Sequence, residues 1–319
     1  MEITHRFVET NGIRLEVAEA GDGPLVLLCH GFPETAHSWR HQLAALAAAG
    51  YHAVAPNQRG YGRSDAPERI ESYSMLQLAG DIIGLAAALG AERFCVAGHD
   101  WGSPVAASVA LFRPDLVRGV ALLSVPYLPR GETDVLSSLT ELLGPDNYQA
   151  YYQVPGVAEE LLEADVRSSM RSMLLNLSGD AERVELLDGV TGADMLPDMS
   201  GMPLPDWLSE ADLDAYVADF EHSGFRGPLN WYRTSMLNWE MTAPWKGAPL
   251  LPPSLYIGGD RDVVYNWPGM SDAIGVLREL SMPSLTKAVV LEGCGHWTQQ
   301  ERAADVNELL TGFVSGLPD

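Results

Sequence analysis

The sequence predicts an α/β protein with a mostly parallel, eight-stranded sheet, helices on both faces and an inserted helical cap. Three observations favour this fold. Short apolar runs alternate with segments of helical spacing, which is typical of parallel strands buried on both faces. One such run ends in the turn Gly98-His-Asp-Trp-Gly102, from which a helix begins. Between residues 130 and 243 the alternation stops, and only helical spacings are found.

Strands are expected where a short apolar run is bounded by turn residues. Asn11-Gly12 is a tight-turn pair and joins the first two strands as a hairpin. The third run is apolar throughout, which indicates a strand with no face toward water. The expected strands cover residues 5–9, 13–19, 24–30, 51–56, 93–97, 117–125, 253–258 and 287–291.

The expected helices carry start and stop signals. Gly50 ends the first of them, and Pro104 suits the first turn of the helix after the Gly98–Gly102 turn. Ser209 and Asp212 have the spacing of a capping box. The Met- and Pro-rich segment 195–205 predicts a packed loop. The expected helices cover residues 38–49, 76–89, 104–112, 157–175, 209–220 and 303–313.

Two prolines, Pro126 and Pro129, stand where the alternating pattern ends. We therefore expect a core domain made of residues 1–126 and 244–319. Residues 127–243 are expected to form a helical cap, inserted between the sixth and seventh strands.

Composition narrows the classes of partner. The 319 residues include 20 basic and 43 acidic side chains, a net charge of −23. Such a chain repels phosphate backbones and anionic lipid, so nucleic-acid and membrane partners are not expected. No apolar run has transmembrane length, and residues 1–5 lack a secretion-signal pattern. Cys29, Cys95 and Cys294 are too scattered for a disulfide framework, which favours a reducing cytoplasm. A monomer or a homodimer is expected.

The turn between Gly98 and Gly102 lifts a carboxylate, Asp100, above the expected sheet. The pattern Gly-x-nucleophile-x-Gly is a strand-to-helix elbow. A serine that attacked a saturated carbon would form a stable ether, whereas a carboxylate forms an ester that water can cleave. Asp100 therefore suits the covalent opening of strained or halogenated carbon centres. The alternative is that Asp100 only caps the helix.

An ester on Asp100 requires a base, and His296 follows the last expected strand in a glycine turn. An acid that orients its imidazole is expected after the preceding strand. Asp262 lies further along that loop and is preferred, with Asp260 as the alternative. The order nucleophile, acid, histidine is that of a hydrolase triad.

Backbone donors are also needed to form an oxyanion hole near the elbow. The residue after the nucleophile is Trp101, and the loop after the third strand supplies Phe32. The Phe32–Pro33 bond is a candidate for the cis form, which would hold a tight turn. His30 and His99 are expected to be structural.

Five segments together resemble the α/β-hydrolase-fold epoxide hydrolases. Three belong to the expected core, namely 30–33 (His-Gly-Phe-Pro), 98–102 (Gly-His-Asp-Trp-Gly) and 293–299 (Gly-Cys-Gly-His-Trp-Thr-Gln). Segments 148–158 and 223–233 resemble the cap of the soluble epoxide hydrolases. The resemblance implies an enzyme that converts an epoxide and water into a vicinal diol, with no metal or organic cofactor.

By the same resemblance, Tyr148 and Tyr232 hold the epoxide oxygen, and Phe32, Trp101 and Trp297 join them in binding substrate. Phenols suit this task because they donate to a developing alkoxide without bringing a positive charge beside the carboxylate. Taken from the residues alone, both tyrosines could equally be core packing. The chain departs from the family pattern at Asn57, where aspartate is frequent.

Two other functions are compatible with this set. A haloalkane dehalogenase shares the Asp-His-acid plan but must cradle a halide. Phe32 supplies no side-chain donor where those enzymes often carry asparagine. A ligand-binding protein that lost catalysis would need none of the catalytic groups. No Cys/His cluster offers a metal site.

Overall fold

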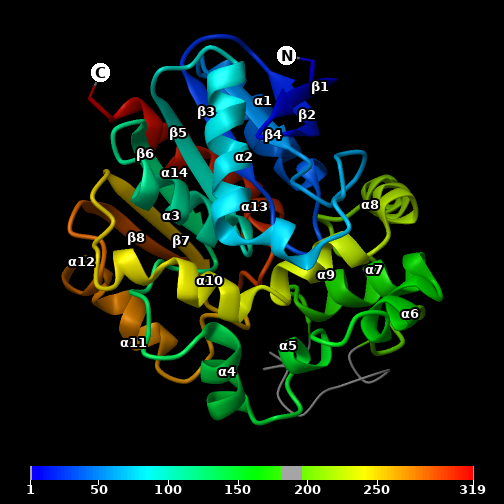
Figure 1. The fold of residues 1–319 in the computed structure, drawn as a ribbon. Coiled ribbons are helices and arrows are strands. Elements are labelled where there is room, and N and C mark those ends of the chain that lie inside the picture. The colour runs from blue at the N-terminus through cyan, green and yellow to red at the C-terminus, as the bar shows by residue number, and fades with distance from the viewer. Residues whose placement is uncertain (1, 182–195, 319) are drawn as a thin grey trace.

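The structure is a computed structural model that describes residues 2–181 and 196–318. Its centre is an eight-stranded sheet with the order β1-β2-β4-β3-β5-β6-β7-β8 (Figure 1). β2 pairs antiparallel with β1 and β4, and the other neighbours are parallel. The predicted sheet is therefore confirmed. The strands are β1 Thr4–Thr10, β2 Ile13–Ala20, β3 Leu25–Cys29, β4 His52–Pro56, β5 Phe94–His99, β6 Val117–Leu123, β7 Ser254–Gly259 and β8 Leu285–Leu291.

Helices cover both faces of the sheet. On one face α1 Arg40–Ala48 packs beside α14 Ala303–Ser315, and on the other α2 Met75–Ala88 packs beside α3 Gly102–Phe112. Each pair buries its own apolar cluster against the strands. The short elements around them are η1 Ala36–Trp39, η2 Ile70–Tyr73, η4 Ala243–Trp245, α11 Met270–Gly275, α12 Leu277–Leu280 and α13 Thr298–Glu301.

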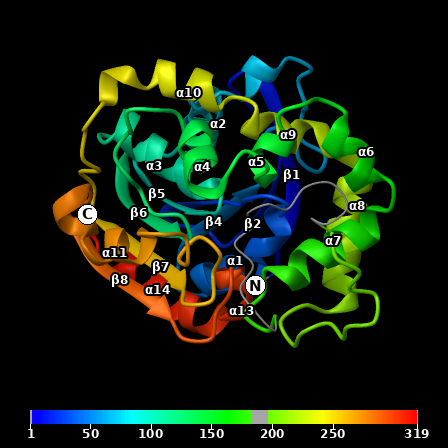
Figure 2. The ribbon, with the colours of Figure 1, turned by 90° about the horizontal axis from the view of Figure 1, so that it is seen from below.

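A helical insert lies between β6 and β7, at the end of the molecule opposite the two chain ends (Figure 1). Seen from that side, α4 and α5 lie across the strands (Figure 2). The exact boundaries 127–243 for the cap, and 1–126 with 244–319 for the core, stay a prediction. The helices of the insert are α4 Val135–Leu143, α5 Tyr148–Tyr151, α6 Val157–Glu163, α7 Val166–Asn176, α8 Glu210–Ser223, α9 Arg226–Tyr232 and α10 Ser235–Met241.

One predicted helix is divided in two. Segment 157–175 was expected to be continuous, but α6 ends at Glu163 and α7 begins at Val166. Asp165 causes the break, since its carboxylate accepts the Ser168 N–H at 3.0 Å as the N-cap of α7. Helical spacing alone does not show such an internal cap.

Other sequence predictions agree in detail. Ser209 and Asp212 form the expected capping box at the start of α8. Residues 196–205 contain no helix or strand, and part of this loop packs against the core; Met195 lies outside the described residues.

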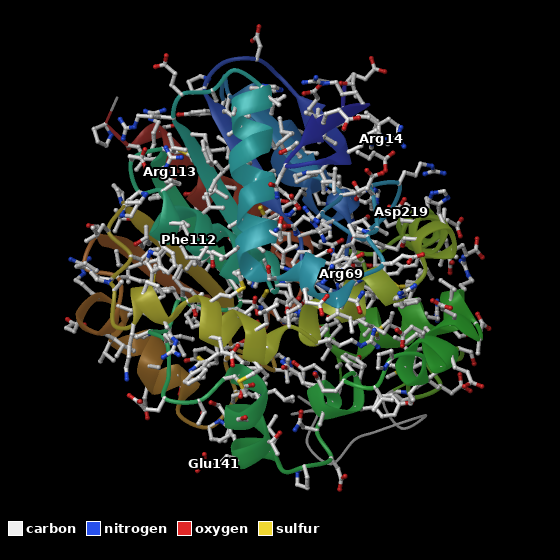
Figure 3. All side chains as sticks on the ribbon, viewed as in Figure 1. Arg14, Arg69, Phe112, Arg113, Glu141 and Asp219 are labelled. Atoms are coloured by element: carbon white, nitrogen blue, oxygen red, sulfur yellow. The ribbon has the colours of Figure 1, made fainter. Side chains whose placement is uncertain are left out.

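Charged side chains cover the outer surface, as Arg113 and Glu141 show in Figure 3. Within the described ranges, no helix is both long and apolar enough to cross a bilayer.

Candidate active site

Asp100 lies at the sharp turn between β5 and α3, with a left-handed φ of 49°. Only glycine fits two residues before Asp100 and two residues after it. A Cβ atom at Gly98 would collide with the carbonyl of Gly102, and one at Gly102 would collide with the carbonyl of Cys29. The strained backbone is held because the Asp100 carbonyl accepts the Ser103 N–H at 3.0 Å. The sequence GxDxG thus builds an elbow that presents one carboxylate.

The two oxygens of Asp100 have different surroundings. Oδ1 accepts the backbone N–H of Phe32 at 2.8 Å, and Oδ2 lies 3.6 Å from Nε2 of His296. Helix α3 begins after Trp101 with no side-chain cap, so the carboxylate is not used as an N-cap. The Phe32–Pro33 peptide is cis.

The loops after β7 and β8 bring an acid to the histidine. His296 Nδ1 donates to Oδ1 of Asp262 at 2.9 Å, and both side chains are buried. Asp260 instead accepts the Gly293 N–H at 2.8 Å and ties the two loops together. Of the two acids left open by the sequence, the structure brings Asp262 to the imidazole.

Burial and the neighbouring charges shift the pKa values of His296 and Asp100 in opposite directions. Burial disfavours the imidazolium, but Asp262 and Asp100 outweigh it and raise the pKa of His296 well above its ordinary value. Burial also disfavours an ionised Asp100, yet hydrogen bonding and the positive charge of His296 lower the pKa of Asp100. The shifts therefore favour an ionised carboxylate beside a protonated histidine.

A cavity of about 270 Å³ opens above Asp100 and His296. Tyr148 from α5 and Tyr232 from α9 line it from the insert, with their ring centroids 6.2 Å apart. Burial raises the pKa of both phenols, so they remain neutral donors. Most of the remaining lining is apolar and includes Met75, Pro104, Val125, Met173, Val263 and Val264.

Comparison with known proteins agrees with this geometry. A family model described as alpha/beta hydrolase fold matches residues 24–303. Epoxide hydrolase A of Mycobacterium tuberculosis is 44% identical, with 98% of each chain covered. Epoxide hydrolase 3 of Siraitia grosvenorii is 39% identical, covering 98% of this chain and 99% of that protein.

The chain belongs to the epoxide hydrolases of the α/β-hydrolase fold.

Solved structures place this epoxide hydrolase among the same proteins. An epoxide hydrolase from an endophytic Streptomyces superposes with a TM-score of 0.93 at 48% identity, covering 98% of this chain and 96% of that one. Epoxide hydrolase A from Mycobacterium thermoresistibile has a TM-score of 0.91 at 44% identity, with 99% of each chain covered.

One expected substrate contact is not found in this epoxide hydrolase. Trp297 is fully buried, and its indole N–H donates to the carbonyl of Leu174 at 2.8 Å. Among the described residues, Trp297 is not one of those that line the cavity. The ring packs against His296, with centroids 4.7 Å apart, and therefore supports the histidine from behind.

The structure also reveals a buried pair that the sequence did not indicate. His99 lies between the carboxylate of Glu34, at 2.7 Å, and the carbonyl oxygen of His296, at 2.7 Å. Both ring nitrogens of His99 face oxygen atoms, one of the Glu34 carboxylate and one of the His296 carbonyl. The pair fixes the backbone of His296. Glu34 directly follows the segment 30–33, which is the only signal that could have indicated it.

A further polar neighbour of the histidine is Ser124, at the end of β6. Its hydroxyl lies 3.2 Å from Nδ1 of His296, and its φ of 66° is rare for a serine. Its carbonyl accepts the hydroxyl of Tyr256 at 2.8 Å. No sequence pattern indicated this residue.

Asn57 has a local explanation. Its side-chain oxygen accepts the Ala36 N–H at 2.7 Å, and its amide nitrogen donates to Glu16 at 2.8 Å. An aspartate here would face the Glu16 carboxylate without that donor. The departure from the family pattern thus concerns loop packing. Over residues 2–181 and 196–318, no group of three or more His, Cys, Asp or Glu side chains is placed to hold a metal ion.

Proposed function

We propose that this epoxide hydrolase adds water to an epoxide through a covalent ester on Asp100 and releases a vicinal diol. The observation that supports this most is the unequal state of the two Asp100 oxygens. Oδ1 is held by the Phe32 N–H, and Oδ2 is left toward His296 and the cavity. Such a carboxylate is oriented for attack by one oxygen only.

In the first step, Oδ2 of Asp100 attacks an epoxide carbon and the carbon–oxygen bond of the ring breaks. Tyr148 and Tyr232 donate hydrogen bonds to the ring oxygen, and one of them gives it a proton. Both hydrogen bonds strengthen as negative charge develops on that oxygen, so they favour the transition state over the bound substrate. The product of this step is a hydroxyalkyl ester.

Ester formation removes the negative charge of Asp100. One of the charges that raise the pKa of His296 is then gone, so its pKa falls and the proton passes to the tyrosinate. Neutral His296, oriented by Asp262, takes a proton from the water that attacks the ester carbon. The amides of Phe32 and Trp101 stabilise the oxyanion. Its collapse breaks the ester bond, the second proton of the added water passes to the leaving alkoxide, and the diol, the Asp100 carboxylate and protonated His296 result.

The apolar lining suits epoxides with hydrocarbon substituents. In this proposal the core supplies the nucleophile, base and acid, and the insert supplies the two phenols. A departing halide would need a second side-chain donor, and the side chain of Phe32 has none.

A single turnover in heavy-oxygen water tests the covalent route. With enzyme in excess over epoxide, the new diol oxygen should come from Asp100 and carry no solvent label. Label in the diol after one turnover would contradict the ester. Halide release from bromoalkanes, without diol formation from epoxides, would instead indicate a dehalogenase.

A further inference from the structure

We infer that Tyr152 binds a second oxygen atom of the substrate, close to the epoxide ring, so that the preferred epoxides carry a hydroxyl or ether oxygen beside the ring. The inference rests on the proposed function and concerns the substrate class of the same cavity. Neither the catalytic steps nor the family resemblance assigns a task to this residue.

Tyr152 directly follows α5 and lines the cavity together with Tyr148 and Tyr232. Its ring lies edge-on to three aromatic neighbours, with centroid distances of 5.0 Å to Tyr232, 5.7 Å to Tyr148 and 6.0 Å to Phe32. Only 4% of the residue is exposed. These contacts hold the ring in one orientation.

The hydroxyl of Tyr152 is without a hydrogen-bond partner among the described residues, but it is not sealed in the core. Tyr61 provides the contrast, since its hydroxyl is both unpaired and closed off from solvent. Tyr152 is not among the residues with such a closed-off polar atom. Since Tyr152 lines the cavity and its hydroxyl is the polar end of the side chain, we place that hydroxyl at the cavity wall.

This phenol stays neutral. Burial first, then the neighbouring phenols and the charge of Asp100, raise the pKa of Tyr152 above the ordinary value. The hydroxyl accordingly offers one hydrogen to donate and lone pairs to accept. It can pair with either a hydroxyl or an ether oxygen of a ligand.

The epoxide oxygen itself does not need this third phenol. It has two lone pairs, and the hydroxyls of Tyr148 and Tyr232 take both in the proposed mechanism. The Tyr148 oxygen already accepts the side chain of Gln149 at 3.1 Å, so its hydrogen is free for the epoxide. Because Tyr152 is adjacent to both phenols, the acceptor that it meets lies on a substituent next to the ring.

A methylene group at that place would leave the phenol buried and unpaired, which costs more than a missing attraction. Two epoxides of equal chain length make the comparison. Butyl glycidyl ether carries an ether oxygen one carbon from the ring, and the terminal epoxide of octane carries methylene there. Intrinsic reactivity cancels when the ratio of their kcat/KM values is compared between enzymes.

We expect the ether-to-carbon ratio to fall about tenfold in Tyr152→Phe. In the control Tyr151→Phe the ratio should stay at the wild-type value, since Tyr151 is half-buried and is not one of the described cavity-lining residues. Circular dichroism checks that both variants fold.

Two results would overturn the inference. An unchanged ratio in Tyr152→Phe would mean that the hydroxyl meets no substrate oxygen. An equal loss on both epoxides would place Tyr152 at the ring oxygen or in packing instead. A wild-type enzyme that forms no diol from either compound would refute the proposed function, and the missing diol distinguishes that case.

Discussion

Replacing Asp262 by asparagine should stall the enzyme after ester formation. The carboxylate accepts the His296 Nδ1–H at 2.9 Å and the Val264 N–H at 2.9 Å, and the residue is fully buried. Asparagine has nearly the same shape, and its carbonyl oxygen can keep the bond to Val264. The substitution therefore removes the charge and leaves the loop in place.

The size of the effect follows from the charge and from the proton position. Two unit charges about 4 Å apart interact by about 4 kcal/mol at an effective dielectric constant of about 20. This stabilisation of the imidazolium, once lost, corresponds to about three orders of magnitude in rate. With the amide turned the other way, its nitrogen donates to Nδ1 and the bond to the Val264 N–H is lost, since one oxygen of Asp262 accepts both bonds. The histidine proton then lies on Nε2 and the base is blocked. Ester hydrolysis should slow by about 10³–10⁴-fold.

Rapid mixing with quench and intact-protein mass spectrometry measures both half-reactions. Asp262→Asn should carry one substrate-derived adduct per chain, while the wild type shows little. The matched control is Asp260→Asn, whose side-chain oxygen can still accept the Gly293 N–H. Normal turnover by Asp262→Asn, with an adduct on Asp260→Asn, would refute the assignment of the acid.

Other variants test the remaining parts of the site. His296→Gln should also retain the adduct, and normal turnover without an adduct would remove this histidine from the mechanism. Tyr148→Phe and Tyr232→Phe should each cost less than the double change, which should lose about 10²–10⁴-fold in kcat; full activity in both single variants would refute the donor roles. Because the pKa of Asp100 is lowered, the nucleophile stays ionised as pH falls, and the acid limb of kcat/KM should lie below the ordinary aspartate range. Gly31→Ala should reduce kcat/KM about a hundredfold with the circular dichroism unchanged, since the new methyl group would collide with the Asp100 side chain; wild-type activity would contradict the close approach.

Much of the fold could be predicted because its signals are local. A buried strand such as β3 is a run of five apolar residues, and its pattern is complete within the segment. The elbow is likewise local, since Gly98 and Gly102 provide the space that the turn requires within five residues. The order of nucleophile, acid and histidine along the chain then indicated which loops meet.

The choice between neighbours depended on distant parts of the chain. The sequence favoured Asp262 over Asp260 only by its place further along one loop. The position of the loop after β8 shows that Asp262 is the one that reaches His296. Trp297 matches a motif, yet the carbonyl of Leu174 in α7 takes its N–H and keeps the ring out of the cavity.

The sequence by itself determined the sheet and the elbow, because apolar periodicity and glycine geometry act over a few residues. Only the tertiary structure decided which polar groups share a cavity. Glu34 meets His99, and Tyr152 meets Tyr232, across long stretches of chain. Each pairing joins residues that are more than 60 positions apart in the chain, so no pattern within one short segment could indicate it.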